Sequence, residues 1–161
     1  MNKQQDTDFL GQAVSLAYNN AQKGGRPFGA VVVRNGQVIA TAVNEILTTN
    51  DPTAHAELLA IRAASQQLAS ARLDNCYVFA SGQPCPMCMA AMRLAGITAV
   101  TYAYSNEDGA PYGLSTADIA AELARPFAEQ SMTIRQQTIE PDVKEGLYAY
   151  WAQQQTGRGT D

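Results

Sequence analysis

The chain has 161 residues, of which 46% are hydrophobic and 16% charged, and its formal net charge is −4. This length predicts a single domain over residues 1–161, and the composition is that of a folded protein rather than a disordered one. No apolar run approaches the ~20 residues that cross a bilayer, and the 11 basic residues are scattered, so a membrane protein is excluded and a nucleic-acid partner is disfavoured.

The first half of the chain predicts a helix, a hairpin and a second helix. Its N-terminus, MNKQQDTDFL, lacks the apolar core of a secretory signal, which predicts a cytoplasmic protein. Apolar residues at helical spacing predict a helix over 7–22. Asn35 and Gly36, between two β-branched runs, predict a two-residue hairpin turn within 29–43. The next helix is expected within 50–70.

The second half of the chain alternates strands and helices. The predicted elements are strands over 75–81, 97–104 and 132–139, and helices over 86–95, 115–124 and 141–155. Turn-forming residues predict a loop over 105–113. The alternation over the whole chain predicts an α/β domain whose sheet is covered by helices on both faces.

A single histidine precedes two cysteines that are spaced as C-x-x-C. His55 stands in TAHAELLA, and Cys85 and Cys88 stand in SGQPCPMCMAAM. Imidazole and two thiolates bind zinc and leave its fourth position for water, and both motifs fall where a helix is expected to begin, which favours thiolates. Because Glu57 does not share a helix face with His55, it is predicted to transfer a proton rather than to bind the metal.

H-x-E followed by P-C-x-x-C is the signature of zinc-dependent nucleobase deaminases. Through HAE and PCPMC the chain resembles the cytidine-deaminase-like superfamily. Through GGRPFGAVVV and TTNDPTAHAELLAIRAA it is most similar to the bacterial guanine deaminases, over roughly residues 8–105. The resemblance implies a three-layer α/β/α cytidine-deaminase-like fold with a central mixed sheet of about five strands, a homodimer, and hydrolysis of a small nucleobase, guanine, to xanthine and ammonia.

The resemblance also implies the roles of individual residues. The implied zinc ligands are His55, Cys85 and Cys88, the proton shuttle is Glu57, the residue that binds the base edge is Asn44, and the pocket wall is Phe28. Without the resemblance, Asn44 is equally consistent with a turn cap after a strand, and Phe28 with the core.

Two positions depart from the family pattern, and so does the C-terminal tail QQQTGRGTD, which lacks the aromatic residue that closes the pocket in guanine deaminases. Gln83 stands before Pro-Cys where the family has glutamate. Thr116, with Asp118 close by, stands where guanine deaminases have the acidic residue that receives the N–H groups of the base. These differences keep isocytosine, cytosine and aminotriazine open as alternative substrates.

Three other interpretations of the motifs remain open at this point. A tRNA adenosine deaminase shares them but needs phosphate contacts, which the net negative charge disfavours. A redox function for Cys85 and Cys88 would leave the histidine unexplained. A binding protein with a structural Cys3His zinc site would need Cys76 as its fourth ligand, whereas a buried free cysteine is normal in a strand.

Overall fold

The computed structural model describes residues 3–138 and 146–156. It divides the chain into two compact units, Met1–Arg125 and Pro126–Asp161, and each is described by itself. The single domain over residues 1–161 stays a prediction. Among the described residues, no helix has both the length and the apolar character that a bilayer crossing requires.

The first unit is built on a mixed sheet of four strands. The strands are β1 (Gly29–Arg34), β2 (Gln37–Val43), β3 (Cys76–Gly82) and β4 (Ala99–Tyr104). Their order is β2-β1-β3-β4. β1 is antiparallel to both of its neighbours, and β3 and β4 are parallel. The predicted mixed sheet is therefore confirmed, with four strands in place of about five.

The hairpin between β1 and β2 turns at the predicted residues. Asn35 and Gly36 have φ angles of 52° and 73°, which fit a two-residue turn that follows the right-handed twist of the strands. β1 is the most buried part of the hairpin, since only its last residue is not fully buried. It therefore lies in the interior of the sheet, with its two side-chain faces covered.

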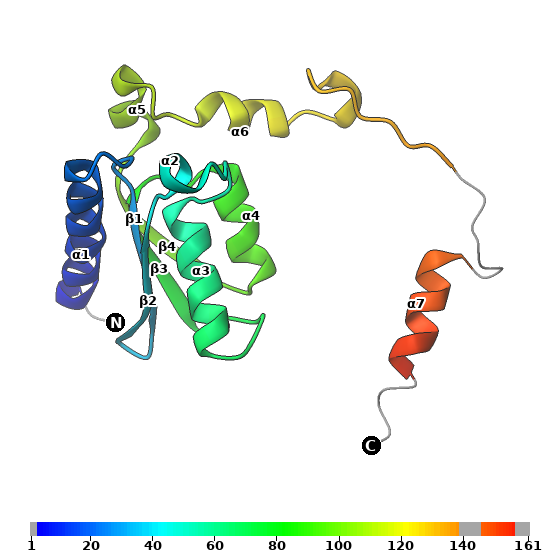
Figure 1. Cartoon of the computed structure of the whole chain (residues 1–161), viewed down its shortest axis with the longest axis horizontal. Coiled ribbons are helices and arrows are strands. Elements are labelled where there is room, and N and C mark those ends of the chain that lie inside the picture. The colour runs from blue at the N-terminus through cyan, green and yellow to red at the C-terminus, as the bar shows by residue number, and fades with distance from the viewer. Residues whose placement is uncertain (1–2, 139–145, 157–161) are drawn as a thin grey trace. The chain divides into compact units, whose positions relative to one another are not determined.

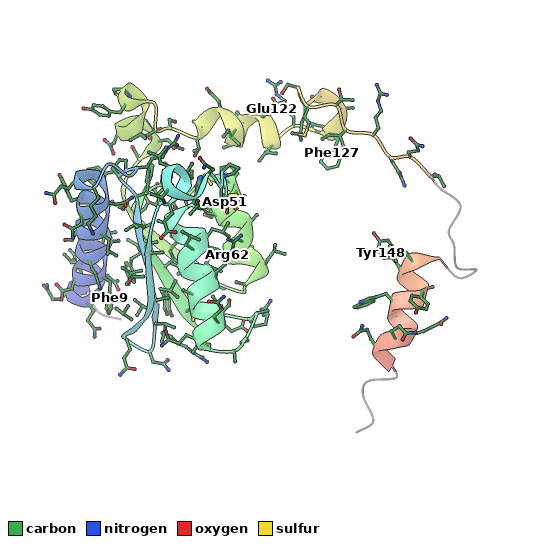
Figure 2. The ribbon with its side chains drawn as sticks, in the orientation of Figure 1. Phe9, Asp51, Arg62, Glu122, Phe127 and Tyr148 are labelled. Carbon is green, nitrogen blue, oxygen red and sulfur yellow. The ribbon has the colours of Figure 1, made fainter. Side chains whose placement is uncertain are left out.

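Helices cover both faces of the sheet (Figure 1). α1 (Lys3–Gln22) lies on one face, and α3 (Ala56–Gln67) and α4 (Pro86–Leu94) lie on the other. On the α1 side, the ring of Phe9, labelled in Figure 2, is 5.4 Å from the ring of Phe79 in β3. The opposite face packs a larger core around the buried Val32. The predicted three-layer arrangement is confirmed.

Short helices lie at one end of the sheet (Figure 1). They are α2 (Ile46–Thr49), α5 (Asn106–Gly109), the 3-10 turn η1 (Ala110–Tyr112) and α6 (Ala117–Leu123). The prediction of a loop over 105–113 is wrong, because Ser105 and Asp108 form a reciprocal capping box that starts α5. The helix predicted over 115–124 is confirmed as α6.

The second unit contains no strand among its described residues. It has a 3-10 turn, η2 (Phe127–Glu129), and a helix, α7 (Leu147–Thr156), which carries Tyr148 (Figure 2). The strand predicted over 132–139 is wrong over residues 132–138, which have no helix or strand and are exposed. Alternation alone does not make a strand without a partner for its backbone. The rest of that strand, and the first residues of the helix predicted over 141–155, lie outside the described residues.

Candidate metal centre and active site

The predicted zinc ligands lie at the first turns of two helices. His55 occupies the N-cap position of α3, and Cys85 occupies that of α4, where Pro86 is the first helical residue. Cys88 follows in the first turn of α4 and is fully buried. Since free N–H groups and the positive end of the helix dipole point toward these residues, the site favours negatively charged sulfur.

The three side chains form a nearly equilateral triangle of donor atoms. His55 Nδ1 is 3.5 Å from Cys85 Sγ and 3.7 Å from Cys88 Sγ, and the two sulfurs are 3.6 Å apart. With metal–sulfur bonds of about 2.3 Å and metal–nitrogen bonds of about 2.0–2.1 Å, a tetrahedral zinc site needs roughly 3.6 Å between nitrogen and sulfur and 3.8 Å between sulfurs. The ligand triangle therefore fits zinc, with the fourth position left to a non-protein ligand.

The ionisation of the ligands is coupled through their hydrogen bonds. The hydrogen bond with Cys88 lowers the pKa of Cys85 to about 4. The same bond, together with burial, raises the pKa of Cys88. The hydrogen bond with Cys85 raises the pKa of His55 above its ordinary value. Of the two thiols, Cys85 is therefore the one that ionises more easily.

Glu57 is an acid buried beside the ligands. Its side chain lies in the first turn of α3 and the residue is only 6% exposed. Burial raises the pKa of its carboxyl, because the charged form loses its hydration. None of the ion pairs between described residues involves it. A carboxyl that lines the same cavity as the metal ligands can both accept and return a proton.

A cavity of about 50 Å³ opens beside the ligand triangle. Three of the predicted substrate-binding residues, Phe28, Asn44 and Thr116, line it together with Glu57. Asp118 is exposed and does not line it. The residues that sequence reasoning did not place there are Arg26, Gln83 and Leu114. Their nearness in sequence to Phe28, Cys85 and Thr116 is the only signal that could have indicated them.

Asn44 combines both of the roles considered for it. Its side-chain Oδ1 accepts a hydrogen bond of 3.2 Å from the backbone N–H of Ile46, which is the turn-capping role. The residue is only 4% exposed and also lines the cavity. Since Oδ1 is engaged by the turn, the amide Nδ2 is the group that can donate to a ligand.

The two positions that depart from the family pattern are joined by a hydrogen-bond chain. β3 and β4 run parallel, and the backbone N–H of Gln83 donates to the carbonyl of Tyr104 at 2.7 Å. Gln83 Oε1 then accepts from the backbone N–H of Asn106 at 3.0 Å. Asn106 Oδ1 accepts from the backbone N–H of Thr116 at 3.0 Å and from its hydroxyl at 3.4 Å. Thr116 therefore presents oxygen lone pairs rather than a carboxylate to the cavity.

Cys76 lies apart from the metal centre. It is the first residue of β3, whereas Cys85 follows the other end of that strand, about 20 Å away at the usual rise per strand residue. The group of potential ligands around His55 includes only Cys85 and Cys88 among the described residues. A structural Cys3His site that uses Cys76 is therefore excluded.

Comparisons with known proteins agree with this geometry. Residues 3–104 match the family model of the cytidine and deoxycytidylate deaminase zinc-binding region. Guanine deaminase of Bacillus subtilis is 42% identical over 132 residues, which are 81% of this chain and 85% of that protein. The X-ray structure of a Bacillus subtilis guanine deaminase superposes with a TM-score of 0.84 and 38% identity, covering 100% of this chain and 99% of that one.

A second group of relatives is more distant. The tRNA-specific adenosine deaminase of Aquifex aeolicus is 38% identical over 94 residues, which are 58% of this chain and 62% of that protein.

The comparisons confirm the predicted resemblance to guanine deaminases. The predicted zinc cofactor is confirmed by the zinc-binding family together with the ligand group of the structure.

Proposed function

Because this chain belongs to the family of the cytidine and deoxycytidylate deaminase zinc-binding region, whose members are zinc-dependent deaminases, we propose that it hydrolyses guanine to xanthine and ammonia. The observation that carries the proposal is the buried carboxyl of Glu57 beside a three-ligand zinc triangle. The similarity to a guanine deaminase over 85% of that protein's length supports guanine as the base.

The three ligands and Glu57 have separate roles in this proposal. His55, Cys85 and Cys88 would hold the zinc ion, which when bound would supply Lewis-acid activation of water near neutral pH. Glu57 would accept one proton from the attacking water and deliver it to the departing amino group, while the second proton of the water goes to a ring nitrogen, so that ammonia leaves and a carbonyl remains. Its burial supports this role, because the raised pKa makes the carboxyl a stronger proton acceptor once ionised than an exposed carboxylate is.

The wall of the cavity orients the base. Asn44 Nδ2 donates to an acceptor on the base edge, and the lone pairs of Thr116 Oγ1 accept from a ring N–H. Phe28 supplies the apolar face against which the ring packs. Asp118 has no contact role in this proposal, because it is exposed and lies off the cavity.

The remaining predictions concern partners and location. We propose a homodimer, which is supported by the exposed apolar side chains of α7, where Tyr148 is 86% exposed and Trp151 60%. We also propose that the enzyme is cytoplasmic and that it has no nucleic-acid partner, and the net charge of −4 supports the second of these statements.

The test is ammonia release by zinc-loaded protein across a panel of substrates. The panel holds guanine, adenine, cytosine, isocytosine, an aminotriazine, their nucleosides and an adenosine-bearing anticodon stem-loop. Guanine is expected to turn over fastest. Activity on another heterocycle, with no activity on guanine, would change the substrate assigned to the enzyme but would still support the deamination reaction. A zinc-bound protein that released ammonia from no compound would refute the proposal in favour of a binding protein.

A further inference from the structure

A second cavity borders the metal cavity and is much larger. Its volume is about 310 Å³, and it is lined by α1, by the end of β3 and by the segment that follows β4. Phe28, Gln83 and Leu114 line both cavities, so these three residues form the boundary between them. The larger cavity is therefore next to the place where the base is proposed to bind.

The volumes show that the metal cavity alone is small for a purine. At about 50 Å³ it has room for a few water molecules. Pockets that bind small organic molecules have volumes of roughly 300–1,000 Å³. A purine with its amino-bearing carbon at the metal centre extends beyond the metal cavity. The neighbouring cavity, at about 310 Å³, leaves space for more than the remaining ring.

The lining of the larger cavity favours apolar groups. None of the described residues that line it is Lys, Arg or His, so it offers no positive charge to a phosphate. Ser81, Gln83 and Asp108 line it, and Ser81 Oγ, Gln83 Oε1 and Asp108 Oδ2 already accept hydrogen bonds of 2.8 to 3.0 Å from backbone N–H groups of the protein. Most of the remaining lining is aliphatic or aromatic, and the cavity therefore gains from van der Waals contact.

Tyrosine rings surround the same cavity while remaining open to solvent. Tyr18 is 64% exposed, Tyr104 51% and Tyr112 78%, and all three line it. Aromatic side chains gathered in one exposed place are typical of a binding site, because their rings lose unfavourable hydration when a ligand covers them. They favour a ligand that is apolar or aromatic.

We propose that the larger cavity binds an apolar or aromatic substituent on the five-membered ring of the base. The substrate class is then a guanine substituted at N7 or N9, rather than a nucleotide or the free base alone. This inference rests on the proposed function, because it assumes that the amino-bearing carbon of the six-membered ring faces the metal centre. The five-membered ring is then at the far end of the base, beyond the boundary formed by Phe28, Gln83 and Leu114.

The first experiment measures binding without turnover. Zinc-loaded Glu57→Gln protein is titrated with guanine, 7-benzylguanine and 9-benzylguanine by calorimetry. At least one benzyl compound is expected to bind about tenfold more tightly than guanine, the difference that a modest apolar contact produces. Benzyl compounds that both bind no more tightly than guanine would overturn the inference.

The second experiment blocks the cavity. Ala21 lies on α1 and lines only the larger cavity. In Ala21→Phe protein, the ratio of kcat/KM for the preferred benzylguanine to kcat/KM for guanine is expected to fall about tenfold. Ala90→Phe is the matched control, since Ala90 is an exposed helical alanine that lines neither cavity. The control is expected to leave the ratio unchanged.

A third variant covers the case in which Ala21→Phe does not fold. Tyr112→Ala removes an exposed ring from the cavity wall and is expected to lower the same ratio. An equal loss for both substrates in these variants would overturn the inference, as would a change of oligomeric state, which would indicate that a second chain occupies the cavity. Failure of the proposed function is distinguishable, because zinc-loaded wild-type protein would then release no ammonia from guanine or from its benzyl derivatives.

Discussion

Replacing Glu57 with Gln separates metal binding from proton transfer. The amide has the shape of the carboxyl and fits the same buried site, so the ligand triangle of His55, Cys85 and Cys88 is expected to keep its zinc. The variant cannot accept a proton from water. Positioned acid–base groups contribute about 10²–10⁴-fold to rate, which corresponds to ~3–5 kcal/mol of transition-state free energy.

The structure places the expected loss in the upper part of that range. Glu57 is the only acid that lines the metal cavity among the described residues. No second carboxyl can therefore take over the proton, and kcat is expected to fall by about 10³-fold or more. Because only the transition state needs the transfer, KM for guanine is expected to change little.

The assay combines zinc analysis with the steady-state rate of xanthine formation. Wild-type protein and the variant are compared at equal zinc content, so that metal loss does not imitate a catalytic defect. A variant that holds zinc and keeps a rate within tenfold of wild type would refute the assignment of Glu57. A variant that loses zinc would show that the carboxyl supports the metal site instead.

The same substitution has a predicted effect on the stability of the metal-free protein. Burial raises the pKa of Glu57 in the folded state above its ordinary value of 4.5. The folded state thus binds more protons than the unfolded state between these two pKa values, and stability falls as pH rises through that interval. Glu57→Gln lacks this loss, so urea titrations above the interval are expected to show a more stable variant. Parallel pH profiles for the two proteins would contradict the raised pKa.

Three further predictions concern the metal site and its walls. Zinc binding to metal-free protein near pH 7 is expected to release roughly one to two protons, and zinc affinity to rise with pH, because the pKa values of Cys88 and His55 are both raised. Calorimetry in buffers of different ionisation enthalpy measures the number of protons released, and a value of zero would show that these residues are not ligands. Gly82→Ala places a methyl group 2.9 Å from the ring of Phe28, so the zinc content should stay the same while kcat/KM for guanine falls about tenfold to a hundredfold. An unchanged kcat/KM would contradict the role of Phe28 in binding the base. Cys76→Ala should keep its full zinc content and activity and lose about 1 kcal/mol of stability, as measured by metal analysis and urea titration. Loss of zinc from this variant would show that Cys76 is a zinc ligand.

Local sequence features predicted the elements whose cause is local. Asn35 and Gly36 set the hairpin because both accept positive φ angles. Pro86 and the C-x-x-C spacing placed the start of α4 and two ligands within one turn. The start of α1 was predicted four residues late, because the polar residues from Lys3 onward carry no apolar periodicity and yet continue the helix.

The parts that sequence reasoning missed depend on contacts between distant segments. Gln83, Asn106 and Thr116 are separated by 23 and 10 positions, and only the parallel pairing of β3 with β4 brings them together. The larger cavity likewise needs α1 and the segment after β4 to meet at the same end of the sheet. No periodicity or motif in one segment encodes such a meeting. The metal ligands were predictable because each motif places its residue at a helix start.

The most direct test of the account is a zinc titration of chelator-stripped protein with guanine as the substrate. Xanthine formation is expected to rise linearly with added zinc and to stop rising at one ion per chain, because the described residues offer one group of three ligands. Full activity without zinc, or zinc bound at one ion per chain with no xanthine formed, would contradict the account.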